Sequence, residues 1–361
     1  MTLSRPPHPP PRWPRASAAL AAAGAAIVAC VPGYDPCFVP ASIVSDVRVL
    51  AVRADPPEAL FDTDGSGVPS SVPVVHVRAL VAGQGPEERL RLRARLCLPT
   101  ASLRCPAESA AVEGALSPKG ASEAAVDLRA TPALLALARE RDPLHGYGGI
   151  RLQLEVDAAA GSDHALASKL LLFSPSATTP HPNQPIELAS VDFTRKDEFD
   201  QSAAPGGTAT LFVPLTYGLR PRLAPLADGS PALEEYDVVD LAGRLVHLRE
   251  QASYDFFTGP ELIFGDLRSV NGNPVGAYSV GGDTGAEPAA GDPEPKNGLV
   301  RVTPLSGADA HLWVVGRDSR GAVAWAALRV RSLDERICDR GDGVPCAAGR
   351  ACCPTLFFGC Q

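Results

Sequence analysis

The chain has 361 residues, of which 45% are hydrophobic, and a formal net charge of −8 at pH 7. This length is enough for a signal segment followed by two domains. An acidic chain without a basic cluster is unsuited to the phosphate backbone, so we expect no nucleic-acid partner.

The N-terminal residues have the order of a secretory signal. Arg5, Arg12 and Arg15 precede an apolar run, Ala16 to Ala29, which ends in small residues. The run is too short and too weakly apolar for a transmembrane helix. Residues 1–29 are therefore predicted to be a signal peptide. Because its three arginines leave with it, the net charge changes from −8 to −11.

The segment Ile27-Val28-Ala29-Cys30 resembles the lipobox of bacterial lipoproteins. In that family a lipid is joined to the Cys sulfur, the peptide is cut before it, and the new N-terminus is acylated. The resemblance implies that Cys30 anchors the protein in a membrane, since each buried CH₂ contributes about 0.8 kcal/mol. Val31 follows where inner-membrane lipoproteins usually have Asp, which implies an outer-membrane location.

An ordinary signal peptide cut after Ala29 is the alternative, with Cys30 free to form a disulfide. Ile27 is a poor match to the small residue that such a cleavage site needs. The nine cysteines also favour lipidation, because using Cys30 leaves eight, which can all pair.

Composition divides the rest of the chain into five segments. They are a Pro-containing tether (30–42), a first β-rich segment (43–174), a Pro-rich linker (175–185), a second β-rich segment (186–332) and a Cys-rich tail (333–361).

Alternating apolar and polar residues predict short strands in the first β-rich segment. The expected strands are 46–51, 74–81, 89–96, 125–128, 150–156 and 165–173, the first of them ending before Pro56. Thr131 and Pro132 have the sequence of a helix start, so a short helix is expected through Arg141.

The second β-rich segment starts at Ile186. Strands are expected at 209–217, 236–240, 244–249, 253–257, 299–303, 312–317 and 322–331. The segment 281–297 has no apolar periodicity and is expected to be a loop.

Many short strands with regular turns and one short helix predict an all-β protein of two tandem β-sandwiches. Residues 43–57, 253–259 and 312–331 resemble strands of bacterial immunoglobulin-like domains. The chain as a whole resembles uncharacterised outer-membrane lipoproteins with such domains, from Gram-negative bacteria with GC-rich genomes. That family implies no known activity.

The cysteines imply an oxidising compartment. Cys97 and Cys105 flank a short loop and are predicted to form a local disulfide. The tail contributes five cysteines, Cys338, Cys346, Cys352, Cys353 and Cys360. Because this number is odd, we expect Cys37 in the tether to bond to one of them. An intermolecular bond is the alternative.

Four motifs suggest chemistry, each with a plainer reading. Asp62, Asp64 and Ser66 resemble half of a calcium loop, but Pro73 stands where a bidentate Glu is needed, so a β-turn is favoured. Ser279 lies near a nucleophile-elbow pattern that lacks the following helix. The tripeptide starting at Arg340, Arg-Gly-Asp, resembles the loop of integrin-binding disintegrins without further context.

The fourth motif is a row of arginines, Arg89, Arg91, Arg93 and Arg95, on one face of a predicted strand. The row would suit an acidic glycan or lipid headgroup. The plainer reading is a solvated face paired with carboxylates such as Glu155.

No metal-ligand spacing is present, so we expect neither a metal nor a cofactor. His247 and His311 are expected on strand faces, and Trp313 and Trp325 in a sandwich core.

These observations favour a non-enzymatic cell-surface lipoprotein, a structural or ligand-presenting module held at the outer membrane by its lipid. A carbohydrate- or cell-wall-binding protein is the alternative, with surface polysaccharide or another envelope protein as partner. A hydrolase is disfavoured, because no motif places a nucleophile beside a base.

Overall fold

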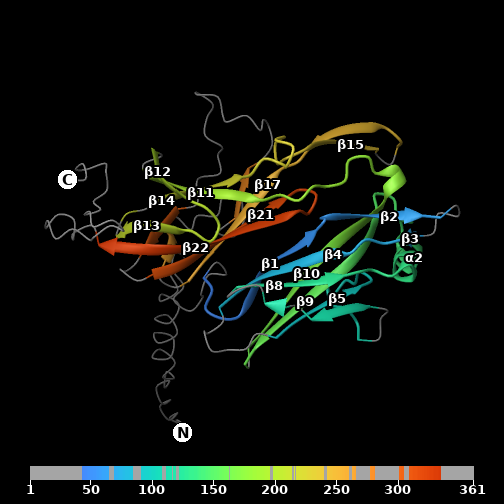
Figure 1. The fold of residues 1–361 in the computed structure, drawn as a ribbon, viewed down its shortest axis with the longest axis horizontal. Helices are drawn as coiled ribbons and strands as arrows, with labels where there is room; N and C mark the ends of the chain where they lie inside the picture. Colours follow the sequence, from blue (N-terminus) through green and yellow to red (C-terminus); the bar gives the residue numbers. More distant parts are fainter. Residues whose placement is uncertain are drawn as a thin grey trace, which may run out of the picture. The chain divides into compact units, whose positions relative to one another are not determined.

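The computed structural model describes residues 43–64, 69–83, 91–107, 111–115, 117–118, 122–161, 163–195, 198–213, 215, 217–239, 242–259, 262–265, 277–280, 301–304 and 309–334. Within them the chain is mostly β-structure, as the sequence predicts, with one short α-helix (Figure 1). No helix among these residues has the length and apolar character needed to cross a membrane.

The first sandwich contains the strands β1 to β10. They are β1 (Arg48–Asp55), β2 (Glu58–Thr63), β3 (Pro69–Ser71), β4 (Val75–Ala82), β5 (Arg91–Cys97), β6 (Val112–Ala115), β7 (Ser117–Pro118), β8 (Glu123–Leu128), β9 (Ile150–Ala160) and β10 (Asp163–Pro175). One sheet has the order β1-β4-β8-β7 and the other β3-β2-β10-β9-β5-β6. Alternate residues such as Val77, Leu96 and Leu154 point between the sheets and form one apolar core.

The helix α2 (Pro132–Arg141) begins where the sequence predicts. The Thr131 hydroxyl accepts a hydrogen bond from the Leu134 amide at 3.1 Å, and Pro132 occupies the first helical turn. Leu134, Leu135 and Ala138 are buried against the core of the first sandwich. A short 3₁₀ helix, η1 (Ser176–Thr178), follows β10.

The second sandwich contains the strands β11 to β22. They are β11 (Leu188–Arg195), β12 (Glu198–Ala203), β13 (Thr208–Val213), β14 (Tyr217–Leu223), β15 (Glu235–Val239), β16 (Leu245–Arg249), β17 (Ala252–Thr258), β18 (Leu262–Gly265), β19 (Ala277–Val280), β20 (Arg301–Pro304), β21 (Asp309–Asp318) and β22 (Val323–Asp334). Its sheets are β12-β11-β14-β20-β18 and β13-β22-β21-β17-β19, while β15 and β16 pair only with each other. A second apolar core includes Phe193, Tyr217 and Phe256.

The two sandwiches have the same strand order. Across the first sheet of each sandwich, β1-β4-β8-β7 corresponds to β11-β14-β20-β18. Across the second sheet, β10-β9-β5 corresponds to β22-β21-β17. In each, an extra strand pairs in parallel with the last strand: β2 with β10, and β13 with β22. This is the order of immunoglobulin-type sandwiches, with strands A, B, E and D in one sheet and C, F and G in the other.

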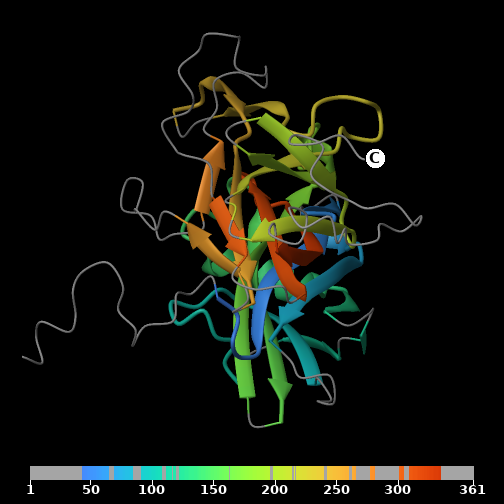
Figure 2. The same cartoon turned by 90° about the vertical axis from the view of Figure 1, so that its left-hand side faces the viewer.

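The sheet β1-β4-β8 of the first sandwich packs against the sheet β22-β21-β17 of the second. Both sandwiches belong to one compact unit. The contact is apolar, and it is called the sandwich interface below. It buries Val44, Leu50, Ala51, Leu80 and Ala82 against Trp313, Val315 and Val323. Figures 1 and 2 show β1 and β4, in blue, lying beside β21 and β22, in orange to red.

Strand periodicity explains how these sheets bury both faces. Along β4, Val77, Ala79 and Val81 enter the first core, whereas Leu80 and Ala82 enter the sandwich interface. In β1 a register shift between Val49 and Ala51 turns Leu50 and Ala51 to the same side.

The expectation that Trp313 and Trp325 lie in a sandwich core is wrong. Leu312 and Val314 fill the second core, so Trp313 between them points to the opposite face and into the sandwich interface. Trp325 packs against this interface, where its indole N–H donates to the Glu123 carboxylate at 2.7 Å and the Arg78 guanidinium lies 5.5 Å from the ring centroid.

Several expected strands differ from the structure in their bounds. The expected strand 209–217 is two strands, because β13 ends at Val213 and β14 begins at Tyr217 in the opposite sheet. The structure also has strands that the sequence analysis does not predict, namely β2, β3, β6, β7, β12, β18 and β19. β2 begins directly after Asp55-Pro56-Pro57, so these prolines separate two strands rather than ending β-structure.

Candidate functional site

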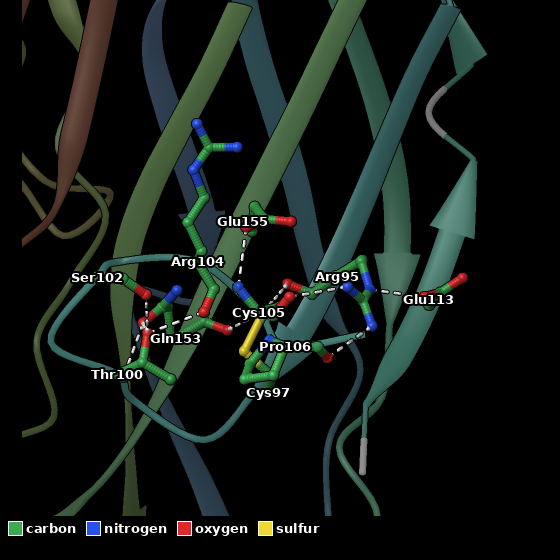
Figure 3. Close-up of a disulfide and its surroundings, with 10 residues drawn as sticks. All are labelled: Arg95, Cys97, Thr100, Ser102, Arg104, Cys105, Pro106, Glu113, Gln153 and Glu155. Atoms are coloured by element: carbon green, nitrogen blue, oxygen red, sulfur yellow. Dashed lines mark hydrogen bonds and ion pairs between the residues drawn. A yellow bond between two sulfur atoms is a disulfide. The ribbon is translucent and has the colours of Figure 1, made fainter. Parts of the chain in front are cut away.

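A disulfide-closed loop lies at one end of the first sandwich. The predicted bond between Cys97 and Cys105 is present, with the two Cα atoms 5.8 Å apart. Two side chains of the strand β9 hold this loop: Glu155 accepts from the Cys105 amide at 2.8 Å, and Gln153 accepts from the Thr100 amide at 3.0 Å (Figure 3). The loop is therefore fixed by the sheet as well as by its own disulfide.

Arg95 belongs to this loop rather than to an open arginine face. Its guanidinium donates to the backbone carbonyls of Cys105 and Pro106 at 3.0 and 3.3 Å and forms an ion pair with Glu113 at 2.6 Å (Figure 3). The sequence suggested Glu155 as a partner of the arginine row. Glu155 does lie opposite Arg95 in the sheet, but its carboxylate accepts from the Cys105 amide instead.

Arg91 and Arg93 form what remains of the predicted row, since Arg89 lies outside the described residues. Both are exposed on β5, and within the described chain neither has an ion-pair partner. They line a groove of about 710 Å³, the arginine groove, together with Leu92, Glu113, Gly114, Ala115, Asp157 and Ala159. Asp157 is paired with His164 at 2.7 Å.

A second, smaller cavity lies between the disulfide-closed loop and the end of α2. This Arg141 cleft has a volume of about 380 Å³. It is lined by Leu98, Pro99, Thr100, Pro106, Ala138, Arg141, Asp142, Pro143 and Arg151. Such a lining, mostly apolar with a few polar groups, is typical of small-molecule sites of similar size.

The loops beside the Arg141 cleft are held in unusual backbone conformations. Leu103 and His145 have φ angles of 55° and 50°, in the left-handed region that non-glycine residues rarely adopt. Asp142 orders the second loop by accepting from the amides of Leu144 and Gly146 at 3.0 and 2.9 Å. These backbone hydrogen bonds lower the pKa of Asp142, so the carboxylate is charged at neutral pH.

A polar cluster joins the two sandwiches around Arg320, in the turn between β21 and β22. Its guanidinium lies 3.0 Å from Glu58, 3.4 Å from Glu250 and 3.7 Å from Glu234, and 4.5 Å from the ring centroid of Tyr236. We call these five residues the Arg320 cluster.

Burial has the largest effect on the pKa values of the shifted groups in and beside this cluster. It raises the pKa of Glu250 to about 7 and also raises that of Asp318, which accepts from three backbone amides of the same turn. Burial lowers the pKa of Lys169, a donor to the Gly321 carbonyl, to about 8.

The remaining sequence candidates do not come together. Asp62 lies on β2 and accepts from the Ser176 hydroxyl at 2.8 Å, while Ser66 lies outside the described residues. Ser279 lies on β19 opposite Ser253. The Arg-Gly-Asp motif and Cys30, Cys37, Cys338, Cys346, Cys352, Cys353 and Cys360 lie outside the described residues.

The two histidines of interest lie on strand faces. His247 is exposed on β16 beside Asp237 at 2.9 Å and Glu235 at 3.4 Å, hydrogen bonds that raise its pKa. His311 stacks on Trp313 with 5.5 Å between ring centroids. Within the described part of the chain, no three His, Cys, Asp or Glu side chains are grouped so that they could hold a metal ion.

Sequence reasoning missed the Arg141 cleft and the Arg320 cluster. In the sequence, Arg320 appears only as a turn residue, and nothing near it indicates Glu58 as a partner. Arg141 appears only as the last residue of an expected helix. Both features join residues that are far apart in the sequence and that the folded sheets bring together.

Comparisons with known proteins add little. No protein-family model matches the chain, and no curated protein matches it. Likenesses among solved structures include a transglutaminase of red sea bream (10% identity, 75% of this chain and 30% of that one, TM-score 0.19). Others are a DUF4785 family protein from Legionella pneumophila (11%, 78% and 56%, 0.22) and a chimeric titin Z1Z2 tandem (9%, 79% and 98%, 0.18).

The chain spans under two thirds of the transglutaminase and of the Legionella protein.

Proposed function

We propose that this chain is a non-enzymatic lipoprotein of the outer membrane, a structural or ligand-presenting module anchored through Cys30. The observation that carries the module is the sandwich interface, an apolar contact that buries Leu80, Trp313 and Val315 between two complete sandwiches. Flexible tandem domains usually have smaller and more polar contacts. Two sandwiches joined by an apolar interface would present their loops at fixed relative positions, and the lipid on Cys30 would hold them at the membrane.

The anchor is tested by replacing Cys30 with Ala. We expect the native chain, expressed in a Gram-negative host, to fractionate with the outer membrane and to incorporate a palmitate analogue. The Cys30→Ala variant should lose both properties. Cys37→Ser is the matched control, because it also removes a cysteine from the same predicted tether, and it should keep the label. A Cys30→Ala variant that still fractionates with the outer membrane would refute lipid anchoring there.

A second candidate function is binding of an acidic surface polysaccharide in the arginine groove. It is supported by the exposed side chains of Arg91 and Arg93, which line a cavity and lack described ion-pair partners. Retention on an immobilised acidic polysaccharide should fall with added salt and in Arg91→Gln/Arg93→Gln. Arg331→Gln, which removes an exposed charge on β22, should be retained like the native chain. If Arg91→Gln/Arg93→Gln is retained as strongly as Arg331→Gln, the arginine groove does not bind the polysaccharide.

A further inference from the structure

The Arg141 cleft combines an apolar floor with two cationic side chains. Leu98 and Ala138 are buried in the core of the first sandwich and line the cleft, as do Pro99, Pro106 and Pro143. Arg141 and Arg151 are exposed and line the same cavity. Within the described part of the chain neither side chain forms a hydrogen bond or ion pair, although the charge of Arg151 helps to lower the pKa of Asp142. Two guanidinium groups that form no hydrogen bond or ion pair within the described chain are therefore available to a ligand beside an apolar surface.

Asp142, the third charged residue in the lining of the Arg141 cleft, determines which ligand charge suits the cleft. Both carboxylate oxygens of Asp142 accept backbone hydrogen bonds, from Leu144 and Gly146. These bonds hold the carboxylate in its turn, so it offsets one of the two arginine charges. The lining is left with a single net positive charge, which matches a monoanion.

The walls of the cleft are fixed before any ligand arrives. The disulfide and the bonds from Glu155 and Gln153 hold the loop on one side. On the other side, Leu144 is half exposed next to a residue held at positive φ, and Leu103 on the facing loop is likewise exposed and left-handed. Backbone strain together with exposed apolar side chains is more typical of binding loops than of loops that only connect strands.

We propose that the Arg141 cleft binds a small monocarboxylate with an apolar body, the carboxylate pairing with Arg141 and Arg151 and the body covering the proline-lined floor. Guanidinium groups suit this task because their planar fork matches a carboxylate with two hydrogen bonds. The competing reading assigns Arg141 only a local role, in which its charge offsets the negative carboxyl end of α2. Only the first reading requires Arg151 as well. The site goes beyond the anchoring role proposed above and does not depend on it.

The test uses the purified full chain and three probes: benzoate, phenylacetate and hexanoate. We expect at least one to saturate the protein in calorimetric titration, whereas its uncharged amide, acetate and inorganic phosphate bind much more weakly. Acetate lacks the apolar body, and phosphate reports on simple anion attraction. Binding of an amide as tight as that of its acid would overturn the assignment of the arginines. Binding of phosphate as tight as that of the three acids would overturn the assignment of the apolar floor.

Variants separate the two readings of Arg141. Arg141→Gln and Arg151→Gln should each weaken the binding roughly tenfold or more, because a charged hydrogen-bond partner is lost. Arg331→Gln is the matched control, since it removes an exposed arginine on β22 that lines neither the Arg141 cleft nor the arginine groove. It should leave the affinity unchanged. An unchanged affinity in Arg151→Gln, or no saturation by any of the three acids at millimolar concentration, would overturn the proposal.

Discussion

The guanidinium of Arg320 lies 3.0 Å from the carboxylate of Glu58, although 262 residues separate them in the chain. Glu58 is buried and begins β2 of the first sandwich, whereas Arg320 lies in the last hairpin turn of the second. The pair is extended by the Ser174 hydroxyl and the Asn183 amide, which both donate to Glu58. This relationship ties the first sandwich, the linker and the second sandwich together.

Replacing Arg320 should be costly. Arg320→Ala leaves Glu58 and Glu250 buried without their cation, and breaking a buried pair in this way costs about 3–5 kcal/mol of folding free energy. The loss is measured from the midpoint of urea unfolding at constant m-value. Arg331→Ala is the control, because its ion pair with Asp309 at 3.9 Å is exposed, and it should cost under about 1 kcal/mol. Similar costs for both variants would contradict the importance of the cluster.

Glu250 predicts a specific dependence of stability on pH. Its pKa is raised by burial from 4.5 to about 7. The folded chain therefore holds more protons than the unfolded chain between these values, so stability falls as pH rises through this window. Glu250→Gln cannot ionise, yet its amide oxygen can still accept from the Glu234 amide.

The free energy of unfolding of Glu250→Gln should therefore rise relative to that of the native chain as pH increases from about 5 to about 8. The pKa of Asp318 is also raised by burial, but Asp318 is present in both proteins. Its titration therefore cancels in the difference between their free energies of unfolding, and that difference reports on Glu250. Urea titrations at several pH values measure this difference. A difference that stays constant across the window would show that Glu250 ionises normally.

Local sequence signals were sufficient for elements that are defined by their own alternation, helix cap or short loop. The alternation in 91–96 and 150–156 predicted β5 and β9, and Thr131 with Pro132 predicted α2. The Cys97–Cys105 bond followed from proximity alone. By contrast, β13 and β14 are separated by only a few residues and yet enter different sheets, so an apolar run across them appeared to be one strand.

Features that depend on distant contacts were not visible in the sequence. Trp313 and Val315 are as apolar as Leu312 and Val314, so the pattern of β21 shows that both of its faces are buried but not what covers the outer one. Arg141 and Arg151 lie on different elements and line a common cavity only because the loop before β6 meets the end of α2.

Removing the disulfide should have a moderate effect. Cys97→Ala/Cys105→Ala frees a loop whose ends are 8 positions apart, which corresponds to about 2–3 kcal/mol of stability. The loop should still form, because Glu155, Gln153 and Arg95 hold its backbone. Urea unfolding gives the cost, and amide hydrogen exchange at Thr100 and Cys105 reports on the loop itself. Complete loss of protection at both amides would show that the disulfide alone orders the loop.

The sandwich interface gives the last prediction, with Leu80 as the residue to change. Leu80 is completely buried and points into this interface rather than into the first core. Leu80→Asp places an unpaired charge there, which costs several kcal/mol, without altering either core. We expect the two sandwiches to separate while each keeps its fold, so that one cooperative unfolding transition becomes two.

Tryptophan fluorescence reports on this interface directly. Of the three tryptophans, Trp13 lies in the predicted signal peptide, Trp313 lies in the interface and Trp325 packs against it. In Leu80→Asp the fluorescence should therefore change at a lower urea concentration than the far-UV circular dichroism, which follows the strands. Leu170→Asp is the matched control, because Leu170 is 50% exposed on β10, and its two signals should change together. Coincident transitions in Leu80→Asp would show that the two sandwiches unfold as one unit even without an intact interface.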